Sequence, residues 1–293
     1  MPHELEIARF RIPTGQTVDL RRDFDPADTA GIGSKKDAAA ALADSVEQLA
    51  ALQERLYAQN VHAVLVIFQA MDAAGKDGAI KHVMSGINPQ GVRVTSFKTP
   101  STVEQDHDYL WRCIRALPPR GQIGIFNRSY YEEVLIARVH PEILAAEQLP
   151  PKAKSSGIWR RRYSEINNFE HYLADNGIHV VKFFLNVSKD EQRRRFLSRI
   201  DEPAKNWKFS AADVAERQHW ADYREAYEKM LTGTSTKHAP WHVIPADHKW
   251  FTRLAVATTI VDTLRGIDPQ FPTVTDEQKA GLEGAREKLL AED

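Results

Sequence analysis

A lysine follows a stretch of small residues in VLVIFQAMDAAGKDGAIKHVM, residues 64–84. An apolar run precedes these residues, and helix-forming residues follow them. This order is typical of a phosphate-binding loop, in which backbone N–H groups surround the phosphates and the lysine bridges them. The full P-loop pattern is not met, because Ala70 replaces its first glycine and Asp77 replaces its hydroxyl residue. From the context we predict phosphate binding by Ala73, Ala74, Gly75, Lys76, Asp77 and Gly78.

Two aspartates of this loop, Asp72 and Asp77, carry the charge that phosphate repels. The cost is roughly 4 kcal/mol for unit charges about 4 Å apart at an effective dielectric constant of about 20. A metal ion reverses the sign, and Mg²⁺ favours one or two carboxylates together with phosphate oxygens. We therefore expect Asp72 to hold Mg²⁺, directly or through water, with Mn²⁺ as an alternative ion. Asp77 either plays a similar part or favours the N-terminus of the following helix.

Asn127, Arg128 and Glu132 follow another apolar run, in GIFNRSYYEEV. Nucleotide kinases often have a metal-supporting aspartate at the end of this strand. Because the amide of Asn127 is a poorer Mg²⁺ ligand, we expect Glu132 to compensate. Arg128 is the candidate catalytic cation, since a guanidinium can bind two oxygens of a transferring phosphoryl group. Its alternative role is a structural ion pair with a nearby glutamate.

Five apolar runs are predicted to form strands, and helical patterns lie between them. The runs cover residues 62–68, 91–97, 122–126, 178–187 and 241–246. Strand and helix in alternation predict an α/β fold, a parallel β-sheet flanked by helices. Ligands of such sheets bind at the carboxyl ends of the strands, which is where the candidate residues fall. Helices are predicted from one-sided apolar stripes at 33–60, 104–117 and 251–267.

A helical hairpin around DEPAKNWK is predicted between the fourth and fifth strands. Ser188 with Glu191 and Ser210 with Asp213 have the spacing of capping boxes. The hairpin is interpreted either as a lid over the site or as an ordinary helical connection. About half of its arginines can face one groove, because they span nearly two helical turns; they are Arg193, Arg194, Arg195 and Arg199.

Composition limits the function classes. The net charge of −1 and the few clustered aromatic residues argue against nucleic-acid binding. No apolar run reaches the roughly 20 residues that span a bilayer, and MPHELEIARF does not resemble a signal peptide, so we expect a cytoplasmic protein with no membrane partner. The chain has one cysteine, Cys113, which excludes an intrachain disulfide, and its setting in LWRCIRAL predicts that it lies in the core.

The chain resembles the polyphosphate kinase 2 family over about residues 50–270. Ordered blocks carry this resemblance: MDAAGKDG, NPQGVRVTSFKTPS, HDYLWR, FNRSYYEEVLIARVH, WRRRYSEINNFE, KFFLNVSKDEQRRRF, PAKNWKFS and APWHVIPADHKW. The FNRSYYE form is similar to the class III branch, whose members phosphorylate nucleoside monophosphates and diphosphates. The resemblance implies a P-loop kinase-like fold, an Mg²⁺ requirement, a helical lid and a homo-oligomer, either a dimer or a tetramer.

The resemblance also assigns roles to residues. The essential loop aspartate of the family falls on Asp72 and its lysine on Lys76, while the arginine that follows the third strand falls on Arg128. Metal contacts are expected from Asp72, Asn127 and Glu132. Lys98 and Arg112 are assigned to the acceptor.

We divide the chain into an N-terminal extension with a docking helix (1–60), a P-loop kinase-like core (61–270) with a lid at about 188–235, and a C-terminal tail (271–293).

The expected activity is transfer of the terminal phosphate of inorganic polyphosphate to AMP, giving ADP, and to ADP, giving ATP. The transfer is expected to need Mg²⁺ and to be reversible, and guanine nucleotides are further candidate acceptors. One alternative is an ATP-dependent nucleoside monophosphate kinase on the same fold, against which Asp77 stands. The other is a non-catalytic P-loop protein that senses nucleotides.

Overall fold

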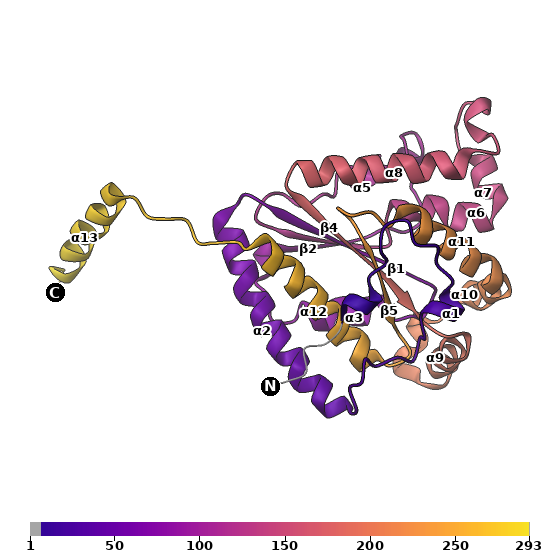
Figure 1. Ribbon diagram of the computed structural model, residues 1–293, viewed down its shortest axis with the longest axis horizontal. Coiled ribbons are helices and arrows are strands. Elements are labelled where there is room, and N and C mark those ends of the chain that lie inside the picture. Colours follow the sequence, from indigo (N-terminus) through magenta and orange to yellow (C-terminus); the bar gives the residue numbers. More distant parts are fainter. Residues whose placement is uncertain (1–6, 293) are drawn as a thin grey trace.

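Residues 7–292 are described by a computed structural model, in which a parallel sheet lies between layers of helices (Figure 1). The strands of this part of the chain are β1 (Ala63–Ala70), β2 (Val92–Ser96), β3 (Ile123–Asn127), β4 (Ile178–Asn186) and β5 (Trp241–Pro245). Their order in the sheet is β2-β3-β1-β4-β5, and every neighbouring pair is parallel. All five predicted strands are present, and the predicted α/β class is confirmed.

The central strand β1 is buried along its whole length, as its uninterrupted apolar sequence requires. Successive side chains point to opposite faces of the sheet. Val64, Val66 and Phe68 therefore join the core beneath α2, α3 and α12, whereas Leu65 and Ile67 join the core beneath α8 and α11. Because both faces are covered, the ends of the strands are where polar side chains gather.

The helical patterns predicted at 33–60 and 251–267 correspond to helices with nearly the same bounds, Lys35–Gln59 and Lys249–Ile267. Among residues 7–292, seven helices have eight or more residues. They are α2 (Lys35–Gln59), α3 (Lys76–Val83), α8 (Ile158–Asp175), α9 (Lys189–Asp201), α11 (Trp220–Thr234), α12 (Lys249–Ile267) and α13 (Asp276–Leu290). Short α-helices are α1 (Leu20–Asp23), α4 (Thr102–Gln105), α5 (Trp111–Ile114), α6 (Ile136–Val139), α7 (Pro141–Ala146) and α10 (Ala211–Glu216). Short 3₁₀ turns are η1 (Ile7–Phe10), η2 (Pro89–Gly91), η3 (Tyr130–Val134), η4 (Pro151–Lys154), η5 (Pro203–Lys208) and η6 (Arg217–His219).

Two local predictions were wrong. The helix predicted over 104–117 is divided into α4 and α5, because the Asp108 carboxylate accepts the N–H of Leu110 and forms a turn there. Cys113 is buried as predicted. Ser210 precedes α10 but makes no side-chain cap, and its expected partner Asp213 instead lies near Arg199. Ser188 does cap α9, by accepting the N–H of Glu191.

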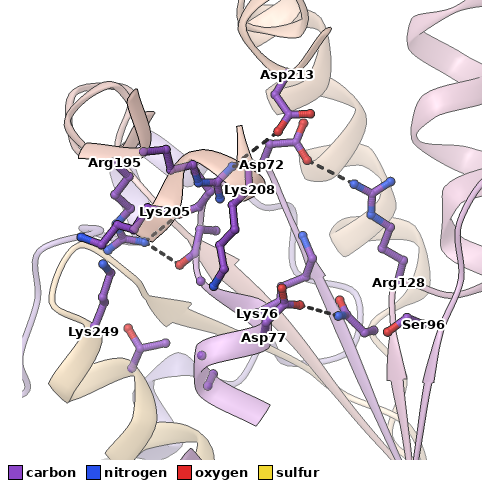
Figure 2. A pocket seen from close by; sticks show the side chains of 18 of the residues that line it. Asp72, Lys76, Asp77, Ser96, Arg128, Arg195, Lys205, Lys208, Asp213 and Lys249 are labelled. Carbon is purple, nitrogen blue, oxygen red and sulfur yellow. Dashed lines mark hydrogen bonds and ion pairs between the residues drawn. The ribbon is translucent and has the colours of Figure 1, made fainter. Parts of the chain in front are cut away.

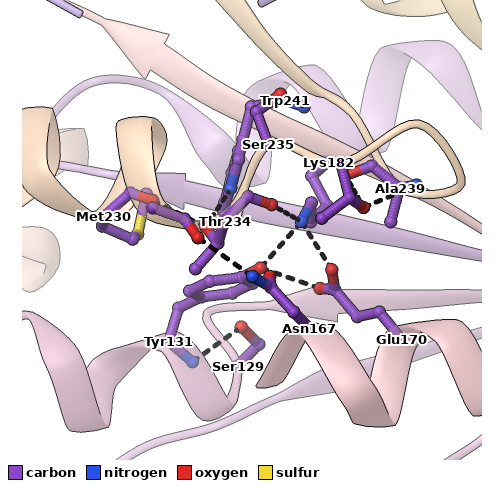
Figure 3. A network of polar contacts seen from close by, with 12 residues as sticks. Ser129, Tyr131, Asn167, Glu170, Lys182, Met230, Thr234, Ser235, Ala239 and Trp241 are labelled. Atoms are coloured by element: carbon purple, nitrogen blue, oxygen red, sulfur yellow. Dashed lines mark hydrogen bonds and ion pairs between the residues drawn. The ribbon is translucent and has the colours of Figure 1, made fainter. Parts of the chain in front are cut away.

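A buried polar network lies beneath η3, the turn that follows β3 (Figure 3). The Lys182 ammonium donates to Glu170, to the Tyr131 hydroxyl and to the Thr234 carbonyl, at 2.6, 2.8 and 2.7 Å. The other oxygen of Glu170 accepts from the hydroxyls of Tyr130 and Tyr131, both at 2.8 Å. The network thus ties η3 to α8, β4 and the end of α11.

The C-terminal helix α13 starts with a capping box between Thr275 and Gln278 and extends away from the sheet and its helices (Figure 1). Across residues 7–292 no helix has the length and apolar character needed to cross a membrane.

Candidate active site

The loop between β1 and α3 has the backbone of an anion-binding site. Ala73 has a φ of 58° and Gly75 a φ of 107°, both in the left-handed region. A loop that changes hand in this way turns successive N–H groups toward one point, and the N-terminus of α3 at Lys76 adds a favourable dipole. Ala70 is the last residue of β1, so this position does not need the conformational freedom of glycine.

A cleft of about 710 Å³ opens in front of this loop (Figure 2). Its walls come from the loop, from the ends of β2 and β3, and from α9, η5 and α12. Nine lining residues are cationic: Lys76, Lys98, Arg128, Arg195, Arg199, Lys205, Lys208, Lys249 and Arg253. Three are acidic: Asp72, Asp77 and Asp213. The cleft therefore attracts anions although the whole chain carries a net charge of −1.

Arg128 lies between two carboxylates. Its guanidinium is 3.2 Å from an oxygen of Asp72 and 3.7 Å from an oxygen of Glu132. Burial raises the pKa of Glu132, and the positive charges of Arg128 and Lys76 oppose this rise. The φ of Arg128 is 64°, a strained conformation for an arginine, and its N–H is held by the carbonyl of Phe68 on β1 at 3.0 Å. Arg128 forms ion pairs with nearby carboxylates and also lines the cleft. The structural and the catalytic interpretation of Arg128 are therefore compatible.

Lys76 and Asp77 face different partners. The Lys76 ammonium donates to the carbonyl of Ala70 at 3.1 Å, and burial followed by the charge of Arg128 lowers its pKa. Asp77 is in the first turn of α3, as its helix interpretation requires, and accepts a hydrogen bond of 2.7 Å from the amide of Asn127. The three predicted metal residues therefore have different partners: Asn127 contacts Asp77, whereas Asp72 and Glu132 both contact Arg128.

The other predicted residues lie at different distances from the cleft. Lys98 lines it, whereas Arg112 supports Lys98 by donating to its carbonyl at 2.7 Å. On α9, Arg193 and Arg194 are exposed and do not line the cleft, while Arg199 does. Arg195 also lines the cleft, but its guanidinium donates to the carbonyls of Ala73, Ala74 and Ala246.

Five charged lining residues escaped the sequence-based prediction: Lys205, Lys208, Asp213, Lys249 and Arg253. The rule that ligands bind at the carboxyl ends of strands also applies to β5, and Lys249 starts the helix that follows this strand. That signal was in the sequence. Asp213 was predicted only as a capping residue, so its position in the cleft was not predicted.

A smaller cavity of about 190 Å³ lies on the other side of Asp72 and Arg128, which line both spaces. Its remaining walls include aliphatic and aromatic side chains, among them Leu135, Ile136, Trp220, Tyr223 and Tyr227. A cationic cleft and a cavity with both polar and apolar walls therefore meet at Asp72, Arg128 and Asp213.

Known proteins resemble this chain over nearly its whole length. A family model described as Polyphosphate kinase 2 matches residues 33–272. An ADP-polyphosphate phosphotransferase of Rhodopseudomonas palustris is 52% identical over 288 residues, which cover 98% of this chain and 99% of that protein. An AMP/ADP-polyphosphate phosphotransferase of Meiothermus ruber is 46% identical over 265 residues, covering 90% and 95%. The crystal structure of Polyphosphate Kinase 2 from Arthrobacter aurescens TC1 has a TM-score of 0.86 and 41% identity, covering 100% of this chain and 97% of that one.

Proposed function

The chain belongs to the polyphosphate kinase 2 family, and we propose that it transfers the terminal phosphate of inorganic polyphosphate to AMP and to ADP. Membership makes the chain a polyphosphate-dependent nucleotide kinase, which is a transferase. The relative from Meiothermus ruber is named for both acceptors, and the one from Rhodopseudomonas palustris for ADP alone. Both AMP and ADP are therefore the acceptors to test first, with guanine nucleotides after them.

The observation that carries the proposal is the excess of cations around the phosphate loop. Nine cationic and three acidic side chains line one cleft, and they come from segments on both sides of the loop. A single nucleotide phosphate needs few such partners, whereas a phosphate chain presents a negative charge at each repeat. We assign the polyphosphate tail to Lys205, Lys208, Arg199, Lys249 and Arg253.

We assign the acceptor nucleoside to the smaller cavity, because its aliphatic and aromatic walls suit a base and a ribose. This differs from the expectation that Lys98 and Arg112 serve the acceptor, since Lys98 lines the cationic cleft. A Tyr223→Ala variant tests the assignment. It should raise the KM for ADP and leave the KM for polyphosphate unchanged.

In the proposed reaction a terminal phosphate oxygen of ADP attacks the end phosphorus of the polyphosphate. A new P–O bond forms, and the bond to the next phosphate breaks, so that the shortened chain leaves with the electron pair. The attacking oxygen is already anionic, so no strong general base is needed. Lys76 and Arg128 bind the oxygens of the transferring group, and the protein acts mainly by positioning and charge neutralisation. One phosphoanhydride replaces another with ADP, so this step is reversible.

We propose Mg²⁺ as the metal, with Asp72 as its ligand from the chain and Asp77 beside it. Among residues 7–292 no three His, Cys, Asp or Glu side chains gather into a complete metal site. This donor set fits Mg²⁺, which takes one or two carboxylates and completes its shell with phosphate oxygens and water. The bound ion would neutralise charge between the two anionic substrates. Glu132 and Asn127 then act through Arg128 and Asp77, the residues that they contact.

We further propose that residues 188–235 act as the lid. Their elements α9, η5 and α10 bring Arg199, Lys205, Lys208 and Asp213 to the cleft. The rest of the division, with residues 1–60 as an extension, 61–270 as the core and 271–293 as a tail, is likewise proposed, as is assembly into a dimer or a tetramer.

The experiment is to incubate the pure protein with Mg²⁺, long-chain polyphosphate and either AMP or ADP, and to separate the nucleotides by chromatography. ADP or ATP should form and increase with the amount of enzyme. A parallel reaction with AMP and ATP tests the alternative nucleoside monophosphate kinase. Absence of product with polyphosphate, together with rapid ADP formation from AMP and ATP, would overturn the proposal.

A further inference from the structure

Three successive carbonyls of the phosphate loop are held by one helix of the proposed lid. The Gln192 amide on α9 donates to the carbonyl of Asp72 at 2.9 Å. One turn later, Arg195 donates to the carbonyls of Ala73 and Ala74 at 3.0 and 2.6 Å (Figure 2). We propose that Gln192 and Arg195 are positioning residues, whose hydrogen bonds to these carbonyls orient the loop for phosphoryl transfer.

The first argument comes from the peptide bond. A trans peptide is planar, so its C=O and N–H groups point in opposite directions. Holding the carbonyls of Asp72 and Ala74 on the side of α9 therefore directs the N–H groups of Ala73 and Gly75 away from α9. These are groups that an anion-binding loop offers to phosphate oxygens. Gln192 and Arg195 therefore determine the direction of these N–H donors by binding the carbonyl of the same peptide group.

The second argument is that the Arg195 guanidinium is already engaged. Arg195 is only 7% exposed. Its Nε donates to Glu191 at 2.8 Å, and its second terminal nitrogen donates to the carbonyl of Ala246 after β5 at 2.5 Å. With the two loop carbonyls, these partners occupy the planar fork of the guanidinium. The predicted role of Arg195 as a phosphate ligand is therefore replaced by a role in holding the loop.

The third argument is the backbone of Ala73. Its φ of 58° is disfavoured for alanine, whose Cβ crowds the following carbonyl oxygen in left-handed backbone. Such a conformation persists where the surroundings hold it in place. Gln192 and Arg195 bind the carbonyls immediately before and at Ala73, so they hold the strained residue on both sides.

The contacts also join the loop to the far side of the proposed lid. The Gln192 oxygen accepts from Arg217 on η6, and Arg217 also donates to the carbonyl of Lys189 at 3.1 Å. A chain of hydrogen bonds therefore runs from η6 through Gln192 to Asp72. The loop has its donors aligned only when α9 and η6 are docked, which couples lid position to the phosphate site.

The test is steady-state kinetics on Gln192→Met, Arg195→Lys and Arg195→Met, with melting temperatures for each. Arg160→Met, which removes an exposed arginine of α8, is the control and should match the wild type. We expect kcat for ATP formation to fall at least about tenfold in Gln192→Met and in Arg195→Lys, since small misplacements of reacting groups have effects of this size or larger. The KM for polyphosphate should stay within about threefold, because the side-chain donors of both residues are engaged by protein carbonyls.

Two results would overturn the inference. A higher KM for polyphosphate with unchanged kcat, confined to the Arg195 variants, would make Arg195 a phosphate ligand. A lower melting temperature with wild-type kcat would leave both residues with a purely structural role. If Arg195→Met does not fold, Gln192→Met and Arg195→Lys decide. The inference rests on the proposed function, and an inactive wild type would count against that function, whereas active variants beside an active wild type count against the inference alone.

Discussion

Replacing Lys182 with methionine is expected to lower the free energy of unfolding by about 3–5 kcal/mol, the usual cost of removing one partner of a buried ion pair. Lys182 and Glu170 are both fully buried and are 2.6 Å apart (Figure 3). Methionine has a similar shape but no donor. It would leave Glu170 without its countercharge and the buried carbonyl of Thr234 without the ammonium that donates to it at 2.7 Å.

Thermal unfolding is the assay for this loss. Each kcal/mol shifts the melting temperature by roughly 2–4 °C in domains of about 150–250 residues, so a fall of about 6–20 °C is expected. The control is Lys229→Met, because Lys229 pairs with Glu225 on the exposed side of α11 and such surface pairs contribute little. Its melting temperature should be that of the wild type.

A double variant tests the physical reason. Adding Glu170→Gln to Lys182→Met removes the unpaired charge, and the glutamine oxygen can still accept from Tyr130 and Tyr131. Neutral replacement of a buried pair is often tolerated, so the double variant should recover at least about 2 kcal/mol of the loss. A single variant that loses less than about 1 kcal/mol, or a double variant no more stable than the single one, would refute the reasoning.

Four further predictions concern the site and the pH dependence of stability. Asp72→Asn and Lys76→Ala should each lower kcat at least about a hundredfold without a change in melting temperature, as expected for groups that stabilise transition-state charge; near-normal rates would contradict the assignment. Lys208→Ala should raise the KM for polyphosphate about two- to fivefold at low salt, and the difference from wild type should shrink as salt is added. Chelation with EDTA should stop ATP formation, and excess Mg²⁺ should restore it; full activity in EDTA would exclude the proposed metal. Burial lowers the pKa of His242 to about 4, whereas a histidine of the unfolded chain has a pKa near 6.5. Between these values the unfolded chain binds more protons than the folded one, so the free energy of unfolding decreases as the pH is lowered. From pH 7 to pH 5 the loss is about 2 kcal/mol, measured by urea unfolding, and His242→Gln should remove this part of it.

The strands could be predicted from the sequence because a strand that is buried on both faces of the sheet has a continuous apolar run. The run HAVLVIF, residues 62–68, has no polar residue after His62, and β1 is buried throughout. The order of the strands could not be predicted in the same way. β1 lies between β3 and β4, so the chain crosses the sheet before it returns, and no local pattern records which crossing occurs.

The arginines of α9 show what a local sequence pattern cannot predict. In EQRRRFLSR, the helical period predicts that some arginines face one side, and Arg195 and Arg199 do share the side of the cleft. Periodicity gives the direction of a side chain but not the partner that it meets. Arg199 is near the carboxylate of Asp213, whereas Arg195 binds carbonyls of a loop more than a hundred positions away in the sequence.

This difference has a physical origin. A guanidinium in solvent-accessible space keeps its charge available to an anion, but a buried one must satisfy its donors with the protein atoms around it. Arg195 is buried because α9 packs against both the phosphate loop and the end of β5, a contact decided by the whole fold. Whether an arginine of α9 is available to a substrate or holds the loop is therefore decided by packing. Packing fixes Asp72 in the same way. Its carbonyl accepts from Gln192 and its carboxylate pairs with Arg128, so both groups are held in the cleft before any substrate binds.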